Sequence, residues 1–401
     1  MVDWIEKTLG EVTSFIAKGI PPKYSEEASK DTIRVLNQKC NRNFEISYSE
    51  SRIHDCAQKK VPTDKMLKVG DVLINSTGTG TAGRVAQMME VTAPTTIDGH
   101  MILLRPSEEL DPIYYGYALK SHQFQIEGLA EGSTGQTEIN RRRLQDEVII
   151  CYPSDKSIQK NIGNFLANID GKIKTNTAIN ENLEQQAEAI FQSILSNAVT
   201  TVNLGEIADV KGGKRLPKGV NLIDIPNTHP YIRVRDLNNV LFASLTPEYT
   251  YVDEETQKSI SRYIVSTGDV LISIVGTIGL TAIVDSTLDK ANLTENCVKV
   301  TNLKHITPEY LLLYLRSQLG REAITKGTVG AVQQKLPIKN IQAIPIPLLS
   351  EKDKNTLFCT LDSIFAEISS NVIQSAMLSS LRDTLLPRLM SGELDVSDID
   401  L

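Results

Sequence analysis

The chain has 401 residues, of which 41% are hydrophobic and 23% charged, and its formal net charge is −7. These fractions are ordinary for a folded globular protein and exclude a low-complexity or disordered chain. No apolar run approaches the ~18 residues that span a bilayer, and the acidic balance argues against a protein that is basic all over its surface.

The first residues of the chain and its cysteines both favour a cytoplasmic location. The opening MVDWIEKTLG has neither a basic region nor an apolar core, so no signal peptide is expected. The five cysteines form no CxxC pair, which favours free thiols in a reducing compartment. Cys40, His54 and Cys56 supply three metal-ligating groups without a fourth nearby, so we expect no metal site.

The first 153 residues predict an α+β lobe. VGDVLINST (69–77) is rich in β-branched residues after a Gly-Asp turn, which predicts a strand. DPIYYGYALKSHQFQIEGLA (111–130) carries a Pro at its start, which predicts a helix. VIICYP (148–153) predicts a last strand that leads out of the lobe.

Within this lobe, GTGTAG (78–83) matches the GxGxxG pattern of dinucleotide-binding proteins. Such a site needs a helix directly afterwards and an acidic residue about 20 positions on. RVAQMMEV (84–91) is at most a short element, and the nearest acid beyond it is Asp98. We therefore expect a hairpin or a DNA-facing loop here, and no cofactor.

A heptad pattern follows the lobe. Apolar or small residues alternate at spacings of four and three for more than four heptads, which is typical of a coiled-coil helix. The seam positions are Ile162, Leu166, Ile169, Ile173, Asn176, Asn180, Leu183, Ala187, Ile190 and Ile194.

The second half of the chain repeats the first in the same order. GDVLI at 70–74 recurs at 268–272, LGEV at 9–12 as LGEI at 204–207, and IRV at 33–35 recurs at 232–234. TPEYLLLYLRSQLGREAIT (307–325) again predicts a helix, and AIPIPLL (343–349) a last strand. The heptad seam recurs as Leu357, Leu361, Ile364, Ile368, Asn371, Ser375, Leu378, Arg382, Leu385 and Leu389, with Pro387 expected to end or kink the helix.

This duplication predicts four segments: lobes at 1–153 and 198–350, and long helices at 154–197 and 351–401. If the helices pair, the second must run back along the first, so the pair is antiparallel with one lobe at each end. A symmetric pairing sets Asn176 opposite Ser375 and Asn180 opposite Asn371. Arg382 would fall beside Ile169, with its guanidinium in water.

Five stretches of the chain carry a resemblance to one known family. They are IRVLNQK (33–39), GDVLINSTGTGTAG (70–83), GSTGQ (132–136), PYIRVRD (230–236) and LLPRLMSG (385–392). Their order, the duplication and the two heptad helices make the chain similar, over essentially its whole length, to the specificity subunit of a type I restriction-modification enzyme. The family often has a Glu-Gln pair at the start of each long helix, whereas this chain has Ile158-Gln159 and Asp353-Lys354 at those places.

The resemblance implies a non-catalytic protein that binds double-stranded DNA. Each lobe is then a target recognition domain that reads a few base pairs. The two lobes read a split target, and the helical pair sets the unread spacer. The implied partners are two adenine methyltransferase subunits, and restriction or translocase subunits are left open.

Side chains with hydrogen-bond donors suited to base edges and phosphates gather in several clusters. The candidate DNA-binding residues are Thr79, Gln136, Arg141, Arg142, Arg143, Lys211, Lys214, Arg215, Arg233, Arg235, Gln333, Gln334 and Lys335. Arg233 and Arg235 alternate on an expected strand, so both should point the same way. Each of these residues also fits an ordinary solvated surface.

Charge is the main objection to the DNA-binding interpretation. Residues 154–197 carry four Lys/Arg and five Asp/Glu, and residues 351–401 carry four and nine, so the lobes are close to neutral. Affinity for DNA must then come from local clusters or from partner subunits. A DNA-independent scaffold that holds two protein partners symmetrically stays open as the alternative.

Overall fold

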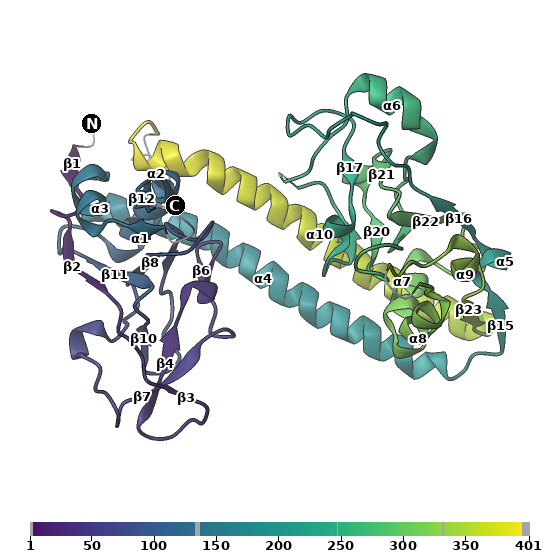
Figure 1. The fold of residues 1–401 in the computed structure, drawn as a ribbon, viewed down its shortest axis with the longest axis horizontal. Helices are drawn as coiled ribbons and strands as arrows, with labels where there is room; N and C mark the ends of the chain where they lie inside the picture. Colours follow the sequence, from purple (N-terminus) through teal and green to yellow (C-terminus); the bar gives the residue numbers. More distant parts are fainter. Residues whose placement is uncertain (1–2, 133–136, 247, 331–332, 395–401) are drawn as a thin grey trace. The chain divides into compact units, whose positions relative to one another are not determined.

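The computed structural model describes residues 3–132, 137–246, 248–330 and 333–394. The chain forms two compact units, one made of residues 1–173 and 377–401 and the other of residues 174–376. Two 40-residue helices, α4 (Lys156–Leu195) and α10 (Glu351–Met390), each contribute to both units (Figure 1). The boundary between the compact units therefore falls within the two helices, whereas the boundaries predicted from the sequence fall at the ends of the lobes.

The first unit is built on a four-stranded sheet in the order β2-β11-β8-β9, in which all neighbours are antiparallel. The strands are β2 (Thr13–Lys18), β11 (Met101–Pro106), β8 (Val72–Asn75) and β9 (Val85–Gln87). Every residue of β8 is buried: Val72 and Ile74 belong to the core with the helices behind the sheet, and Leu73 belongs to a smaller cluster with Leu36 and Ile97. A smaller sheet, β10-β4-β7-β3, contains β10 (Thr95–Ile97), β4 (Thr32–Leu36), β7 (Arg52–Asp55) and β3 (Tyr24–Ser25).

The second unit repeats the main sheet in the order β16-β22-β19-β20, with β18 (Phe242–Ala243) added at the edge. Its strands are β16 (Asp209–Gly212), β22 (Cys297–Thr301), β19 (Val270–Ser273) and β20 (Thr281–Val284). Beside it, β17 (Tyr231–Ile232) and β21 (Asn292–Leu293) form a short parallel pair. In each unit the first strand pairs antiparallel with the last: β1 (Trp4–Thr8) with β14 (Ile149–Pro153), and β15 (Thr200–Asn203) with β23 (Pro345–Leu348). The α+β class predicted for the lobes is confirmed.

The repeated GDVLI is a turn followed by a buried strand. Gly70 has φ +91° and Gly268 has φ +85°, a region that suits glycine because it has no Cβ. Asp71 accepts a hydrogen bond from the Lys68 backbone N–H at 2.8 Å and pairs with Arg105 at 2.7 Å. Asp269 does the same with Ser266 at 2.9 Å and Lys299 at 3.3 Å. The motif recurs because both sheets need the same turn and the same buried ion pair.

The Pro-initiated starts of the two predicted helices are confirmed, but each predicted helix is divided into two. In α1 (Pro112–Ser121), the Asp111 carboxylate caps the backbone N–H groups of the first turn, and in α7 (Pro308–Arg316) the Thr307 hydroxyl does so. Each is followed by a second helix, α2 (Gln123–Gly128) and α8 (Gln318–Gly327). Two further short helices, α3 (Arg141–Glu147) and α9 (Ile338–Gln342), precede the last strands.

One match between the halves was misaligned. Asp98 donates its backbone N–H to the Leu36 carbonyl at 3.0 Å, and Thr294 donates to the Ile232 carbonyl at 3.1 Å. Ile232 is therefore the equivalent of Leu36, and the shared IRV triplet is displaced by three residues. The residue of the first unit that corresponds to Arg233 is Asn37.

The prediction that Arg233 and Arg235 lie on a strand is also wrong. β17 ends at Ile232, and residues Val234–Leu237 form the 3-10 helix η3, just as Gln38–Cys40 form η1 in the first unit. The Asp236 carboxylate accepts the Arg233 backbone N–H at 2.8 Å, which favours a turn over continued strand.

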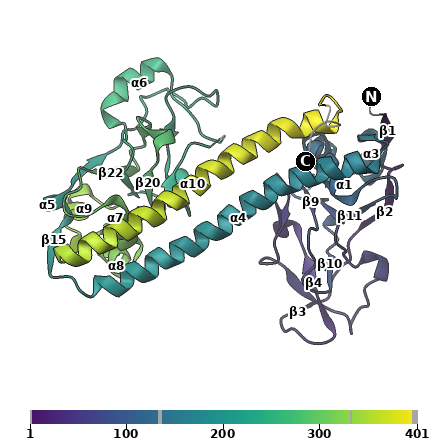
Figure 2. The same cartoon turned by 180° about the vertical axis from the view of Figure 1, so that it is seen from behind.

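In the second unit, α4 and α10 lie side by side and run antiparallel (Figure 2). The Asn176 amide donates to the Ser375 hydroxyl at 3.2 Å and to Gln374 at 2.9 Å. The Asn371 amide donates to the Asn180 side-chain oxygen at 3.0 Å. Both predicted pairs are confirmed, and Asn176 and Asn371 are buried.

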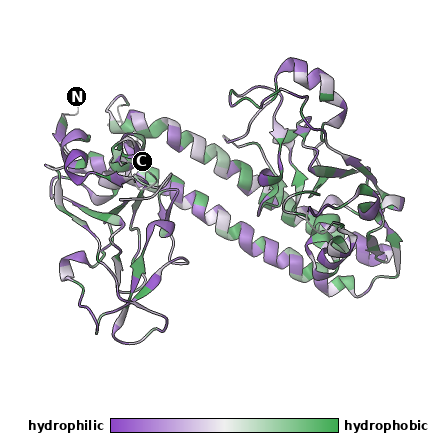
Figure 3. Cartoon of the chain, viewed as in Figure 1, coloured by the Kyte–Doolittle hydropathy of each residue, from purple (hydrophilic) through white to green (hydrophobic). Residues whose placement is uncertain are grey.

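In the first unit, the seam residues Ile162 and Leu166 are buried in the lobe core together with Leu389. The helix does not end at Pro387, because it continues to Met390 and stops near Gly392, whose φ is +76°. The Arg382 guanidinium does not reach bulk water as expected. It pairs with Asp170 and, at 2.8 Å, with Asp383. Both helices mix hydrophilic and hydrophobic residues along their length (Figure 3).

Candidate nucleic-acid interface

In the first unit, several polar side chains meet at one end of the main sheet, where β2 and β8 end and β11 begins. Ser76 donates its backbone N–H to the His100 carbonyl at 2.7 Å, and the Thr77 hydroxyl lies 2.9 Å from His100 Nδ1. Thr77 also forms a β-bridge with Glu138, whose carboxylate pairs with Lys18 at the end of β2. We call this set the reading edge of the first unit.

The loop with the GxGxxG pattern borders this edge. Gly78 donates its backbone N–H to the Thr137 carbonyl at 3.3 Å, and Thr79 at the tip is exposed. Gly83 has φ +88°, and a Cβ there would lie 2.6 Å from the Glu127 backbone. The loop is followed by β9 of the same antiparallel hairpin instead of a helix, so the dinucleotide interpretation is excluded here. Gln136 lies outside the described residues.

The three consecutive arginines do not behave as one cluster. Asn140 caps α3, and Arg141 and Arg142 are exposed beside a pocket of about 530 Å3 that Lys18 and Glu138 also line. Arg143 instead lies 2.5 Å from both Glu131 and Glu147, and these hydrogen bonds hold its pKa above the ordinary value. Arg142 approaches Asp146 at 3.7 Å, beyond hydrogen-bond distance, and its side chain is exposed. Arg141 and Arg142 therefore remain available to a ligand, whereas Arg143 ties α3 to its neighbours.

The second unit has an equivalent reading edge. Val275 after β19 bridges to Lys335 as Thr77 does to Glu138, and Leu336 donates its backbone N–H to the Ile274 carbonyl at 3.0 Å. Lys335 and Val329 exchange two backbone hydrogen bonds of 2.9 Å, which close the loop between them. The candidate side chains on this loop, Gln333, Gln334 and Lys335, are all exposed.

The basic residues in and just after β16 mostly have partners within the lobe. Lys211 pairs with Asp209 at 3.0 Å, and Arg215 pairs with Glu295 at 2.7 Å. The Lys214 ammonium lies 5.5 Å from the centre of the Tyr263 ring, within the range of a cation–π contact. These contacts hold the loop in shape and reduce the charge that it offers to phosphates.

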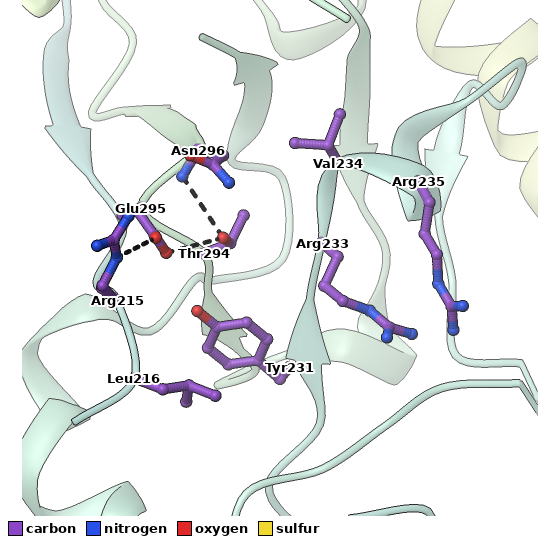
Figure 4. A pocket seen from close by; sticks show the side chains of 9 residues that line it. All are labelled: Arg215, Leu216, Tyr231, Arg233, Val234, Arg235, Thr294, Glu295 and Asn296. Carbon is purple, nitrogen blue, oxygen red and sulfur yellow. Dashed lines mark hydrogen bonds and ion pairs between the residues drawn. The ribbon is translucent and has the colours of Figure 1, made fainter. Parts of the chain in front are cut away.

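A pocket of about 410 Å3 opens at this edge (Figure 4). Its lining residues are Arg215, Leu216, Tyr231, Arg233, Val234, Arg235, Thr294, Glu295 and Asn296. Arg235 donates to Asp236 at 3.2 Å and to the Glu248 carbonyl at 2.8 Å. Burial raises the pKa of Asp236 to about 6, although the neighbouring Arg235 opposes that rise. The structure thus brings Arg215, Arg233 and Arg235 into one pocket.

Sequence reasoning missed the side chains that stand just before strands. His100 and Asn296 precede β11 and β22 in equivalent places, and Asn296 lines the pocket. Gln38 donates to the Thr77 carbonyl at 2.6 Å and so supports the first reading edge. The only available signal was the recurrence of their positions at an offset of 196, because their residue types differ between the halves.

Other kinds of site find little support in the part of the chain that is described. No group of three or more His, Cys, Asp or Glu side chains is arranged to hold a metal ion there. His54 uses both ring nitrogens locally, because Nδ1 accepts the Lys23 backbone N–H at 2.8 Å and Nε2 lies 2.7 Å from the Lys59 carbonyl. Within the same described ranges, no helix has the length and apolarity of a bilayer span.

A family model described as the type I restriction modification DNA specificity domain matches the chain twice, over residues 1–185 and 197–375. The chain belongs to this family. Each match begins with one lobe and runs into the long helix that follows it. The predicted duplication and the family resemblance are both confirmed.

One solved structure shares the fold, and a second matches over most of its length. The type I restriction-modification S subunit from M. genitalium is 18% identical, covers 97% of this chain and 96% of its own, and superposes with a TM-score of 0.61. The HsdS subunit from Thermoanaerobacter tengcongensis is 16% identical and covers 98% of this chain and 97% of its own, with a TM-score of 0.35. No curated protein sequence matches the chain.

Proposed function

We propose that this specificity subunit reads a bipartite DNA target, one half-site per lobe, and docks two methyltransferase subunits in the cytoplasm. It has no catalytic activity of its own and selects the DNA on which its partners act. The observation that carries the proposal is that both units build the same reading edge from equivalent loops and equip it with different side chains. Thr77 and Glu138 in the first unit correspond to Val275 and Lys335 in the second.

Different side chains on one scaffold are what a split target with two unlike halves requires. Base edges are told apart by their pattern of hydrogen-bond donors and acceptors, so a change from a carboxylate to an ammonium changes the sequence that is read. The near-neutral lobes fit this role if the partner subunits supply much of the general attraction to phosphates.

The half-site assignment is tested with the full chain in complex with its methyltransferase subunits. Arg141→Ala with Arg142→Ala should weaken contacts over one half-site only, because both side chains are exposed beside the first reading edge. Footprinting on targets with either half scrambled measures this. Lys304→Ala is the matched control, since Lys304 is exposed beyond the opposite end of β22. Equal loss over both halves would show that the lobes are not separate readers.

Docking of two copies of one partner is supported by a second equivalence. Phe124 on α2 is 90% exposed and Leu319 on α8 is 53% exposed. Each follows a glutamine that donates to a glutamate four positions on, Gln123 to Glu127 at 2.9 Å and Gln318 to Glu322 at 3.0 Å. The two units therefore present an apolar side chain at the same place, which suits two identical partners.

Light scattering of the assembled complex tests this surface. Phe124→Ser and Leu319→Ser should each remove one methyltransferase subunit, and the double variant should remove both. Ile225→Ser is the control, because Ile225 is 76% exposed and has no apolar counterpart in the first unit. Unchanged stoichiometry in the double variant would place the docking surface elsewhere.

The alternative function is a DNA-independent scaffold that holds two protein partners symmetrically. It predicts an assembled complex that ignores duplex DNA, whereas the proposed function predicts binding that weakens steeply as salt concentration rises. A mobility-shift titration at several salt concentrations separates the two.

A further inference from the structure

We propose that Arg233 reads a guanine in the half-site of the second lobe, while Arg215 and Arg235 hold the pocket in shape. This assignment rests on the proposed function and adds to it the residue and the base. It is argued from the hydrogen bonds that each arginine of the pocket already makes.

Two of the three arginines are committed within the protein. Arg215 Nε lies 2.7 Å from the Glu295 carboxylate. Arg235 donates to both the Asp236 carboxylate and the Glu248 carbonyl. Redirecting either guanidinium toward a base would break charge-assisted hydrogen bonds, which are among the stronger ones in proteins.

Arg233 is different. Its Nε and Nη2 atoms are buried and have no hydrogen-bond partner within the described part of the chain. Among the described residues, its one ion pair is a 3.7 Å approach to Asp236, which exceeds hydrogen-bond distance. The Asp236 oxygens are already used, since Oδ2 accepts the Arg233 backbone N–H and Oδ1 accepts from Arg235.

The guanidinium of Arg233 is thus free to turn, while the backbone of this residue is fixed. The Arg233 backbone is held on both sides, by its N–H to Asp236 at 2.8 Å and by its carbonyl, which accepts the Asp236 N–H at 3.0 Å. Turning the guanidinium toward a ligand in the pocket breaks no hydrogen bond. Figure 4 shows the side chains of Arg233 and Arg235 pointing the same way, with Val234 pointing away from them.

The chemistry of the free edge selects guanine. Nε–H and one Nη2–H are parallel donors, and O6 and N7 of guanine are a matching pair of acceptors in the major groove. Adenine presents an amino donor in place of O6, so it satisfies only one of the two. Unpaired buried donors are costly to the free protein, and the correct base would relieve that cost.

The corresponding position of the first unit is spent on structure. Asn37 accepts the Lys39 backbone N–H on its side-chain oxygen at 2.9 Å and donates its amide to the Glu50 carbonyl at 2.7 Å. Each group of the Asn37 amide thus already has a partner within the lobe. Loss of Arg233 should therefore relax one half-site and leave the other unchanged.

The test maps adenine methylation by the assembled complex on DNA randomised in both half-sites. Arg233→Ala should lose preference for a guanine at one position of one half-site, by roughly 5- to 150-fold, with the other positions still selected. Arg233→Lys keeps the charge without the paired donors and should lose the same preference. Lys304→Ala is the control, because Lys304 is exposed in the same unit, beyond the opposite end of β22, and does not line the pocket.

The outcomes separate this assignment from the proposed function. A wild-type complex with no bipartite target would overturn both. A wild-type bipartite target that Arg233→Ala and Arg233→Lys leave unchanged would overturn the assignment alone. A uniform loss of methylation across all sequences in folded Arg233→Lys would also overturn it, because that is the behaviour of a phosphate contact.

Discussion

The aspartate of the repeated Gly-Asp turn is expected to stabilise each lobe without reading DNA, and Asp71→Ala tests this. Asp71 makes a two-pronged contact with Arg105, with Nε at 2.7 Å and Nη2 at 3.0 Å, and its side chain is 3% exposed. Removing one member of a buried ion pair destabilises a protein by about 3–5 kcal/mol. For a unit of roughly 200 residues, this corresponds to a fall in Tm of about 10 °C.

Asp269→Ala in the second unit is the matched comparison. Lys299 makes one contact with Asp269 at 3.3 Å, and it also donates to the Ile264 carbonyl at 2.8 Å, a bond that survives the substitution. A lost hydrogen bond to a charged group costs about 1.5–3 kcal/mol, so the second unit should be destabilised less.

Differential scanning calorimetry of the full chain measures both changes, and methylation mapping of the assembled complex measures specificity. We expect a lower Tm in both variants, a larger fall for Asp71→Ala, and the same DNA target as wild type at a permissive temperature. An altered half-site without loss of stability would refute the reasoning, because it would mean that the aspartate contacts DNA.

Three further predictions concern the scaffold. Gly268→Ala should lower the stability of the fold by about 1–3 kcal/mol through its positive φ alone, since a Cβ there meets nothing within 4 Å. Gly70→Ala should lower it more, because its Cβ would lie 3.0 Å from Pro112, and thermal unfolding of both variants measures the difference. Burial lowers the pKa of Lys120 to about 8, so the buried charge disfavours folding below pH 8, and that penalty fades as pH rises toward 10.5. The stability of Lys120→Met relative to wild type should therefore fall by up to roughly 3 kcal/mol between pH 7 and 10.5, and a constant difference would contradict the buried charge. Asn176→Leu should raise Tm, because it removes a buried side-chain oxygen without a partner in the described chain, but it should make hydrogen exchange along α4 less protected if the helices then slip in register.

Features set by local chemistry could be predicted from the sequence. The Gly-Asp turns, the Pro-initiated helices and the heptad seams each depend on residues within a few positions of one another. The seam also fixed its own pairing, because the polar positions Asn176 and Asn371 interrupt two otherwise apolar stripes and a symmetric antiparallel match is the one that joins them. The observed hydrogen bonds follow that match.

Features set by distant contacts could not. Arg233 and Arg235 lie in an alternating segment that favours a strand, yet the Asp236 carboxylate turns the chain after Ile232. The IRV triplet gave a wrong alignment of the two halves for the same reason. Three identical residues carry less information than the backbone hydrogen bonds, which make Leu36 and Ile232 equivalent. Arg382 was expected in water because its partner, Asp170, lies on the other long helix.

The pattern of what the two units share and where they differ bears on how the protein works. The shared residues lie in turns, caps and close contacts, such as Gly83 and Gly279, which both have positive φ and lie against α2 and α8 respectively. The differences lie at the reading edge. Glu138 and His100 of the first unit correspond in position to Lys335 and Asn296 of the second. A carboxylate accepts hydrogen bonds, as from the amino group of cytosine, whereas an ammonium donates them. If each lobe reads one half-site, as proposed, different side chains at these few equivalent positions would let two related lobes read half-sites of different sequence.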